Sequence, residues 1–226
     1  MSDQPVLLWD LPTRLFHWSL TLLVAGAFLS GQLGGDWIDW HASLGLATTG
    51  LLAFRLVWGI VGSTYARFAQ FFPTPRRTLA YLRGKWRGCG HNPLGALSIL
   101  AMIGLLLLQI TSGLFTNDDI TFEAPLYALV DKGTSDALTG WHRSTSTALL
   151  VMIASHLAAI LFYTVVKRRN LIRPMFSGRQ SSTECRPAKG GGPGALMLAF
   201  CAALGALYLA NGSWLNAALG YLAPGL

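Results

Sequence analysis

Charged side chains are scarce in this chain. Of its 226 residues only 12% are Asp, Glu, Lys or Arg, whereas 52% are hydrophobic. Soluble domains carry about 25% charged residues, so this composition argues against an ordinary water-soluble enzyme. The formal net charge is +7, but the basic residues lie in short segments between apolar runs rather than on one polar domain. This distribution is typical of membrane proteins, and it makes membrane lipid, not nucleic acid, the expected partner.

Cysteine is scarce as well. The chain has three, Cys89, Cys185 and Cys201, and no C-x-x-C motif. The cysteine spacing therefore supplies the ligands of neither a zinc knuckle nor an iron–sulfur cluster. A C-x-x-C-H motif is missing too, so any haem would be held by axial coordination and packing, not by thioether bonds.

Long hydrophobic runs are what the sequence does contain. Five of them approach the roughly 20 residues needed to cross a hydrocarbon core of about 30 Å, namely residues 13–31, 42–61, 94–115, 145–166 and 195–215. The fifth carries a row of alanines that permits close helix packing, the alternative being a lipid-facing helix with no packing partner. Homo-oligomerisation stays open. The predicted fold class is an all-α integral membrane bundle.

Two polar segments separate these runs. Residues 71–87 combine aromatic side chains with Arg and Lys, which is typical of a segment resting on anionic headgroups. Residues 177–194 are rich in Ser, Gly, Pro and charge, which indicates a flexible linker. We therefore expect a transmembrane domain over 1–176, a cytoplasmic linker over 177–194 and a C-terminal transmembrane helix within 195–226.

The charge of the connecting segments predicts the orientation. Six basic residues and no acid lie between the second and third spans, and seven basic residues and one acid follow the fourth span. The other two connections are acidic. Because short cytoplasmic loops carry the excess of Lys and Arg, the N-terminus is expected in the cytoplasm and the C-terminus in the periplasm.

Histidines stand out against this apolar background. His17, His41, His91, His142 and His156 all lie in the predicted spans or at their ends. A polar side chain inside a bilayer is costly, so such residues are functional candidates. Any one of them alone is more simply read as a helix-packing or interfacial residue, and the functional interpretation depends on how they are grouped.

The histidines group by depth. His142 and His156 are fourteen residues apart, close to four full turns, so both imidazoles lie on one helix face about 21 Å apart along the axis. His41 shares the outer level with His142, and His17 shares the inner half with His156. Because a haem that only transfers electrons takes two axial imidazoles, we predict two non-covalent b-type haems held by these pairs.

Three arginines are candidates for the haem propionates, because Arg pairs with carboxylates bidentately. Arg14 and Arg55 lie at the inner level and Arg143 is next to His142. The alternative for each is ordinary snorkelling to the headgroups.

Two haems with two ligands each need four histidines, so His91 is a fifth histidine without a ligand role in this scheme. It precedes Asn92 and Pro93, which look like a helix start, so His91 is a candidate for a helix cap, a propionate partner or part of a quinone pocket. In the last case His91 and Asn92 would offer hydrogen-bond donors, with Trp86 and Phe72 as walls.

Several motifs, in order along the chain, are similar to those of a known family. They are WDLPTRLFHW (9–18), GHNPLGALSIL (90–100), TSGLF (111–115), WHR (141–143), SHLAAI (155–160) and RNLIRPMFSG ending at Gly178. Together they resemble bacterial cytochrome b561 and the b-type cytochrome subunit of nickel–iron hydrogenases over roughly residues 6–178. The resemblance implies a four-helix di-haem core with ligands on the first, second and fourth helices, which correspond to His17, His41, His142 and His156. A fifth helix beyond this core is a departure.

We interpret the chain as a respiratory cytochrome b of a bacterial inner membrane. It would transfer single electrons between the quinone pool and a periplasmic redox partner such as a c-type cytochrome, which the acidic segment 117–140 would attract. Two alternatives stay open: a membrane-anchor subunit of a larger dehydrogenase or hydrogenase complex, and a quinone-linked superoxide oxidase, an activity that the resemblance implies. Whether the chain is itself a quinone-linked oxidoreductase is likewise open. A haem-free transporter would show broken helices or an inverted repeat, and neither is evident.

Overall fold

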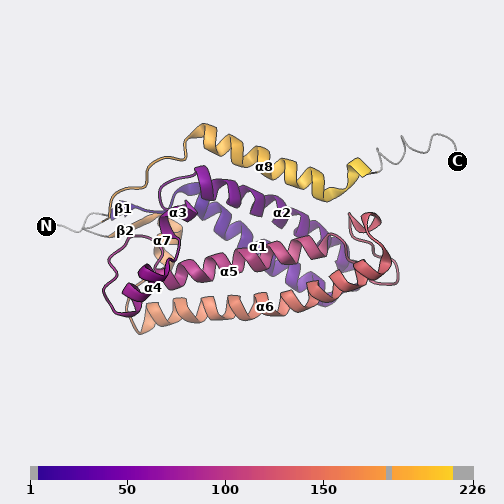
Figure 1. Cartoon of the computed structure of the whole chain (residues 1–226), viewed down its shortest axis with the longest axis horizontal. Coiled ribbons are helices and arrows are strands. Elements are labelled where there is room, and N and C mark those ends of the chain that lie inside the picture. The colour runs from indigo at the N-terminus through magenta and orange to yellow at the C-terminus, as the bar shows by residue number, and fades with distance from the viewer. Residues whose placement is uncertain (1–4, 182–184, 216–226) are drawn as a thin grey trace. The chain divides into compact units, whose positions relative to one another are not determined.

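The computed structural model describes residues 5–181 and 185–215, and most of these residues are helical. Within the described residues, five helices are long and apolar enough to cross a membrane, and each overlaps one predicted span. They are α1 (Leu11–Leu33), α2 (Ile38–Val61), α5 (Pro93–Gly113), α6 (Lys132–Val165) and α8 (Pro193–Asn211), all labelled in Figure 1. The expected helical, multi-pass membrane fold is confirmed. Residues 216–226 of the C-terminal segment lie outside the described residues.

The start of α6 differs most from the prediction. The helix begins at Lys132, thirteen residues before the predicted start of the span at 145. Residues 132–144 are mostly polar, so hydrophobicity alone could not include them. Asp131 caps this early start, because its carboxylate accepts hydrogen bonds from the Thr134 backbone N–H at 3.0 Å and from the Thr134 hydroxyl at 2.7 Å. His142 therefore lies well inside a helix instead of at its outer end.

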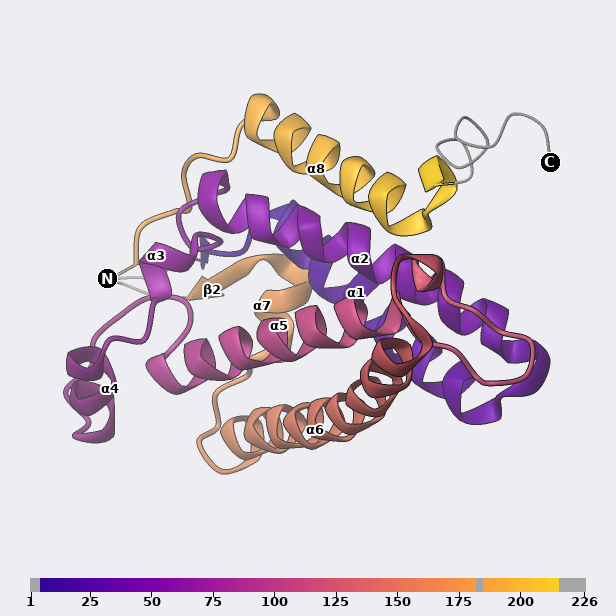
Figure 2. The ribbon, with the colours of Figure 1, turned by 45° about the vertical axis from the view of Figure 1, so that its right-hand side comes forward.

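Two short helices occupy the connection between α2 and α5. These are α3 (Phe68–Phe71) and α4 (Pro75–Leu82), which Figure 2 shows on the same loop. Thr74 caps α4 by accepting from the Arg77 N–H at 3.3 Å, and Pro75 occupies the first turn, where its missing N–H costs nothing. Leu79 and Leu82 are exposed. The same part of the sequence carries four basic residues, namely Arg77, Arg83, Lys85 and Arg87. This segment has the amphipathic character expected of an interfacial element.

A small antiparallel sheet joins residues 5–7, near the N-terminus, to residues 179–181. Strand β1 (Pro5–Leu7) pairs with β2 (Arg179–Ser181), with Val6 opposite Gln180. Between α7 (Ile172–Ser177) and β2, Gly178 adopts a φ of 75°, and its carbonyl accepts from the N–H groups of Leu8 and Trp9. A Cβ at this position would lie 2.6 Å from the Trp9 carbonyl oxygen. Only glycine fits this turn.

Residues 185–191 are also bound to the fold, which differs from the flexible linker expected of their composition. We call this segment the strap. The Tyr65 hydroxyl donates to the Arg186 carbonyl at 2.7 Å, and the Ala188 N–H donates to the Leu7 carbonyl at 2.8 Å. Thr64 and Lys189 exchange hydrogen bonds in both directions at 2.8–3.1 Å. Composition could not reveal these contacts, because their partners are more than 120 residues away in sequence.

The described chain forms two compact units, and the long helices contribute to both. The first unit takes the described residues within 1–18, 55–104 and 149–198, and the second takes those within 19–54, 105–148 and 199–226. Within the second unit α8 packs on α2, with the Phe200 ring 5.3 Å from that of Phe54 and Leu207 against Gly50. Figures 1 and 2 both show these two helices side by side. The fifth helix therefore has a packing partner within the chain.

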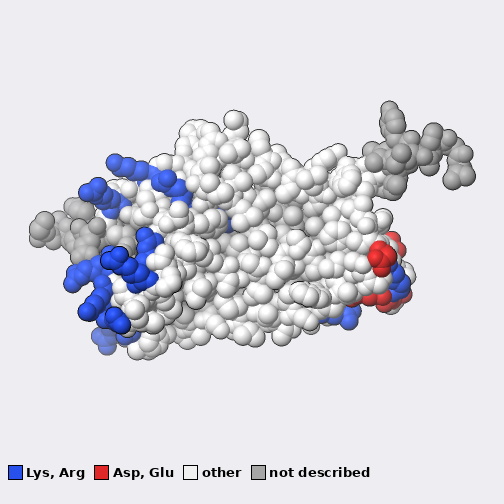
Figure 3. Space-filling model, in the orientation of Figure 1, with Lys and Arg blue, Asp and Glu red and all other residues white. Residues whose placement is uncertain are grey.

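Charge is divided between the units. The first unit holds fifteen of the seventeen Lys and Arg residues, and the second holds seven of the ten Asp and Glu residues. In Figure 3 most of the basic side chains, coloured blue, gather in one group, and a few others lie beside the red acidic side chains. The two histidine pairs of the sequence analysis fall one in each unit: His17 and His156 in the first, His41 and His142 in the second.

Candidate functional site

His41 and His142 face each other within the second unit. Their ring centroids are 5.8 Å apart and their planes are nearly perpendicular. The His41 Nδ1–H donates to the Ala27 carbonyl on α1 at 2.7 Å, and the His142 Nδ1–H donates to the Gln109 carbonyl on α5 at 2.9 Å. A carbonyl oxygen only accepts, so each ring carries its proton on Nδ1 and has its lone pair on Nε2, the nitrogen that can bind a metal.

Two glycines make room for this pair. A Cβ at Gly31 would lie 2.8 Å from His41 Nδ1, and a Cβ at Gly113 would lie 2.7 Å from His142 Cε1. Any side chain at either position would push the imidazole away. The sequence analysis missed both residues, although glycine inside a transmembrane helix often marks a close approach.

Gln109 is the third residue that the sequence analysis missed. Its side-chain amide donates to His142 Nε2 at 3.0 Å, while its Oε1 accepts from the Thr145 hydroxyl at 2.5 Å. An amide in an apolar helix needs such partners. The Gln109 side chain therefore occupies the approach to the Nε2 lone pair, and its carbonyl orients the same ring.

His17 on α1 and His156 on α6 lie close enough within the first unit to interact electrostatically. The His17 ring meets the Trp18 ring edge-on, with centroids 5.0 Å apart. Trp18 stacks on Phe176 at 4.4 Å and donates its indole N–H to the Met175 carbonyl at 3.2 Å. Helix α7 thus supports the turn of α1 that carries His17.

Arg14 and Arg55 both lie in this first unit. Arg14 donates from Nη1 to the Phe176 carbonyl, and its buried Nε has no hydrogen-bond partner among the described residues. Arg55 is 3% exposed, donates to the Ala66 carbonyl at 3.0 Å and lies over the Phe68 ring at 4.6 Å. Two cations near the inner histidine pair, one with a donor to spare, are suited to an anionic group.

His91 lies between two aromatic rings, those of Trp9 at 4.5 Å and Phe71 at 4.7 Å. It interacts electrostatically with Arg55, His156 and His17, which places it beside the inner pair. Burial lowers the pKa of His91 to about 3, so the ring is neutral at physiological pH, with one donor and one acceptor nitrogen. Its buried Nδ1 has no partner within the described chain.

A cavity of about 290 Å³ opens beside this ring. His91, Phe71, Trp86 and Cys89 contribute to its wall, together with Gln70, Arg77, Arg87, Gly88 and Pro93. His91 and Trp86 are thus brought together as the sequence analysis expected. The second wall residue is Phe71, whereas Phe72 is exposed and does not line the cavity.

Asn92 has a different role from the one considered for it. Its Oδ1 accepts from the Gly95 N–H at 2.8 Å, so Asn92 caps α5, and its amide reaches the Tyr163 hydroxyl at 3.5 Å. The helix cap is therefore Asn92 and not His91. Asn92 is not part of the cavity wall.

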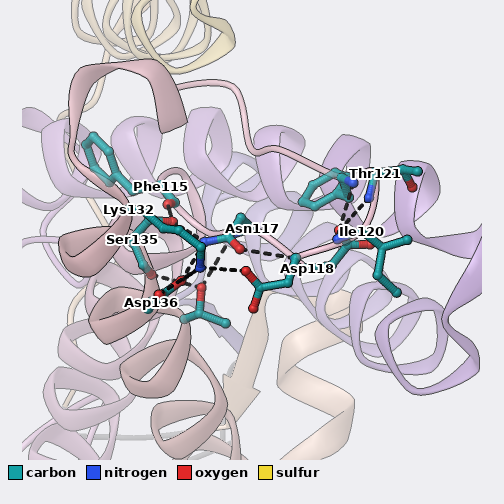
Figure 4. Close-up of polar contacts among 11 residues, drawn as sticks. Phe115, Asn117, Asp118, Ile120, Thr121, Lys132, Ser135 and Asp136 are labelled. Atoms are coloured by element: carbon teal, nitrogen blue, oxygen red, sulfur yellow. Dashed lines mark hydrogen bonds and ion pairs between the residues drawn. The ribbon is translucent and has the colours of Figure 1, made fainter.

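The acidic loop between α5 and α6 uses its carboxylates to hold its own structure. Asp118 accepts from the N–H groups of Ile120, Thr121 and Phe122 at 2.8–2.9 Å. Lys132 forms ion pairs with Asp119 at 2.6 Å and with Asp136 at 2.9 Å, as Figure 4 shows in part. Arg143, nearby in sequence, is exposed. These bonds shape the loop without removing its net negative charge.

The outer pair fits a haem better than a bare metal ion. Within residues 5–181 and 185–215, no group of three or more His, Cys, Asp or Glu side chains is placed to hold a metal. A haem needs only axial ligands from the protein, since the porphyrin supplies the others. His41 and His142, whose ring centroids are 5.8 Å apart, would be the two residues that hold such a group.

Comparison with known proteins gives a consistent result. The family model described as prokaryotic cytochrome b561 matches residues 8–178. The chain is 21% identical over 212 aligned positions to a probable Ni/Fe-hydrogenase 1 B-type cytochrome subunit of Escherichia coli K12, covering 76% of this chain and 89% of the relative. The corresponding protein of E. coli O157:H7 matches equally well. No solved structure gives a significant match.

Proposed function

This chain belongs to the prokaryotic cytochrome b561 family, and on that premise we propose that it transfers electrons across the membrane between the quinone pool and a periplasmic redox partner. Membership implies haem b and an electron-transfer role. Haem supplies a one-electron carrier whose potential is tuned by axial ligands and burial. The protein's part is to hold, orient and enclose it.

The observation that carries the proposal is the outer histidine pair. Two imidazoles face each other at 5.8 Å, and both Nδ1–H groups are bound to carbonyls of neighbouring helices. Such outer partners fix the tautomer and raise the basicity of a metal-binding imidazole. His41 and His142 would hold the outer haem, which requires the Gln109 amide to leave His142 Nε2. Arg143 would reach toward the propionates.

The inner haem would be held by His17 and His156. The electrostatic interaction of the two rings and the spare buried Nε of Arg14 support this assignment. Arg14 and Arg55 would then pair with the propionates, which would otherwise be unpaired charges near the membrane interior. Two haems per chain allow electrons to cross from one membrane face to the other.

The orientation follows from the charge distribution. Fifteen basic residues belong to the first unit, so this unit would lie toward the cytoplasm of a bacterial inner membrane. The N-terminus would then be cytoplasmic and the C-terminus periplasmic. The outer haem would face the periplasm.

Quinone would bind in the cavity beside His91. A six-coordinate iron cannot bind substrate, so a membrane redox partner must approach a haem edge. The cavity of about 290 Å³ offers apolar walls from Phe71 and Trp86 and an unpaired, buried Nδ1 on His91. A buried polar atom without a partner indicates a missing ligand or water, and a quinone oxygen or hydroxyl fits it.

The test is quinol-driven haem reduction by the His91→Ala variant. We expect both haems to be retained and reduction to slow at least tenfold, since a hydrogen bond in a desolvated site contributes about 1.5 kcal/mol or more. Leu82→Ala, exposed on α4 and outside the cavity wall, is the matched control and should be unchanged. A His91→Ala rate equal to that of the wild type would exclude this site.

The periplasmic partner would be a basic protein such as a c-type cytochrome. Residues 117–140 carry five acidic residues against one lysine, and this net negative charge steers a cationic partner toward the loop. The same field repels an anion, so it disfavours superoxide as the substrate at that face. Electron transfer to a basic cytochrome should therefore slow as ionic strength rises.

A second candidate is an anchor subunit of a larger redox complex. It is favoured by the similarity to a subunit that bears the name of a nickel–iron hydrogenase. In that case a partner subunit would cover the acidic loop, and gentle detergent extraction should recover a stable complex. Purification as a haem protein without a further subunit would favour the first candidate.

A further inference from the structure

Two cysteines that are far apart in sequence form a disulfide in the first unit. Cys89 precedes α5 and Cys185 begins the strap, 96 residues later, with their Cα atoms 5.7 Å apart. Both residues are partly buried, so reagents can reach them. The third cysteine, Cys201, is free and exposed on α8.

The strap does not depend on this bond alone. Arg186, Ala188 and Lys189 are fastened by backbone hydrogen bonds to Tyr65, Leu7 and Thr64. If the disulfide opened, these hydrogen bonds would still hold the strap in place. Only the covalent link between Cys185 and the loop that carries Cys89 would be lost.

A basic residue lies close to each of the two cysteines in the sequence. Arg87 lies two residues before Cys89, and Arg186 directly follows Cys185. Nearby cations stabilise a thiolate, which is the reactive form in exchange reactions. Reactive cysteines occupy partly exposed sites, whereas structural ones are usually buried. Cys89 and Cys185 are partly exposed, and both pack against the cluster of Leu8, Trp9 and Tyr65.

The cytoplasmic location expected for both cysteines also favours a disulfide that opens and closes. The basic segments that contain Cys89 and Cys185 are those that the charge distribution assigns to the cytoplasm. Disulfides there are rare, and those that form in mesophiles are usually transient, catalytic or redox-sensing. Cys89 also lines the cavity next to His91, so a change at this sulfur changes the wall of the cavity.

We propose that Cys89 and Cys185 are a thiol–disulfide exchange site, reduced by a cytoplasmic dithiol, whose state controls access to the cavity beside His91. A thiolate of the dithiol attacks one sulfur, the Cys89–Cys185 bond breaks and a mixed disulfide forms. The second thiolate of the dithiol then attacks the mixed disulfide. This attack frees the thiol of the chain and leaves the reductant with a disulfide between its own two sulfurs. Two electrons and two protons pass to the chain, which holds two thiols, and the dithiol is oxidised. The control of access rests on the proposed quinone function, whereas the exchange itself does not.

The exchange is tested by thiol labelling of the full-length, haem-loaded protein in a Cys201→Ser background. Dithiothreitol redox buffers are applied without denaturant, followed by a maleimide and intact-mass measurement. We expect no label on the oxidised protein and two labels per chain after reduction, with the haem spectrum retained. Cys185→Ser in the same background should take one label without reduction. Labelling that requires denaturant, or loss of haem on reduction, would show a structural disulfide and overturn the proposal.

The location is tested in cells. Alkylation during lysis should trap a reduced fraction that falls on diamide treatment and recovers afterwards. An invariant, fully oxidised pair that an impermeant maleimide labels from outside only after reduction would place it in the periplasm and contradict the proposal.

The control of access is tested by quinol-driven haem reduction in the oxidised and reduced states. We expect the rate to differ several-fold between them, and the difference to vanish in the Cys89→Ser/Cys185→Ser double variant. Equal rates in both states would overturn this part. Absence of quinol-driven reduction in either state would instead refute the proposed quinone function, while the labelling result would stand.

Discussion

At the scale of single residues, the outer pair depends on glycines as much as on histidines. An imidazole can face its partner only if the neighbouring helix leaves space behind it. Gly31 and Gly113 leave that space on α1 and α5, where a Cβ would lie 2.8 Å or less from the rings of His41 and His142. Each ring is then fixed by one hydrogen bond from Nδ1.

Gly113→Ala should therefore weaken the outer haem selectively. Overpacking by one methyl group costs about 1–3 kcal/mol, which corresponds to a loss of affinity of roughly fivefold to 150-fold. The measurement is haem content and redox spectrum of the purified variant. Gly104→Ala, on the same helix with nothing within 4 Å of its Cβ, is the control. Equal haem loss in both variants would show a general effect on α5 rather than contact with His142.

At the scale of elements, the loop between α5 and α6 is held by Asp118 and Asp131. The Asp118 carboxylate accepts hydrogen bonds from three backbone N–H groups, and Asp131 caps α6. The cap fixes where α6 begins, ten residues before His142. Hydrogen bonds from the backbone N–H groups of Ile120, Phe122 and Thr121 hold the pKa of the Asp118 carboxyl below its usual value of 3.8.

The Asp118→Ala variant should loosen this loop. A carboxyl whose pKa is depressed by folding stabilises the fold above its ordinary pKa, and the stabilisation is lost as pH falls through the lowered value. Hydrogen exchange of residues 120–122 should be several-fold faster in the variant at neutral pH. In the wild type the same protection should fade only under strongly acidic conditions.

Glu123→Ala changes a neighbouring exposed acid and should leave that exchange unchanged. Protection that is insensitive to Asp118→Ala would mean that other contacts hold the loop.

At the scale of the whole molecule, hydrophobic runs and histidine spacing were enough to predict five spans and to place His41 and His142 at one level, where the structure brings their rings together. The predicted start of the fourth helix was wrong, because residues 132–144 are helical but mostly polar. Hydropathy detects only the apolar part of a helix. It could not reveal the Cys89–Cys185 bond or the strap, because no local pattern marks contacts between segments so far apart. Gln109 was missed because a single amide in an apolar run shows its partners only in the fold.

The topology makes a prediction at this same scale. Since the basic residues are concentrated in the first unit, a reporter that is active only in the periplasm should be active when fused after Leu226. The same reporter inserted after Gly178 should be inactive. The reverse result would invert the molecule in the membrane and exchange the compartments faced by the two haems.

The most direct test of the central claim is the number of haem groups per chain. Pyridine haemochrome analysis of the purified, full-length protein should give two b-type haems, both removable by acid–acetone because no C-x-x-C-H motif is present. His41→Ala, His142→Ala, His17→Ala and His156→Ala should each retain one. A single haem in the wild-type chain, or haem that resists extraction, would contradict the account.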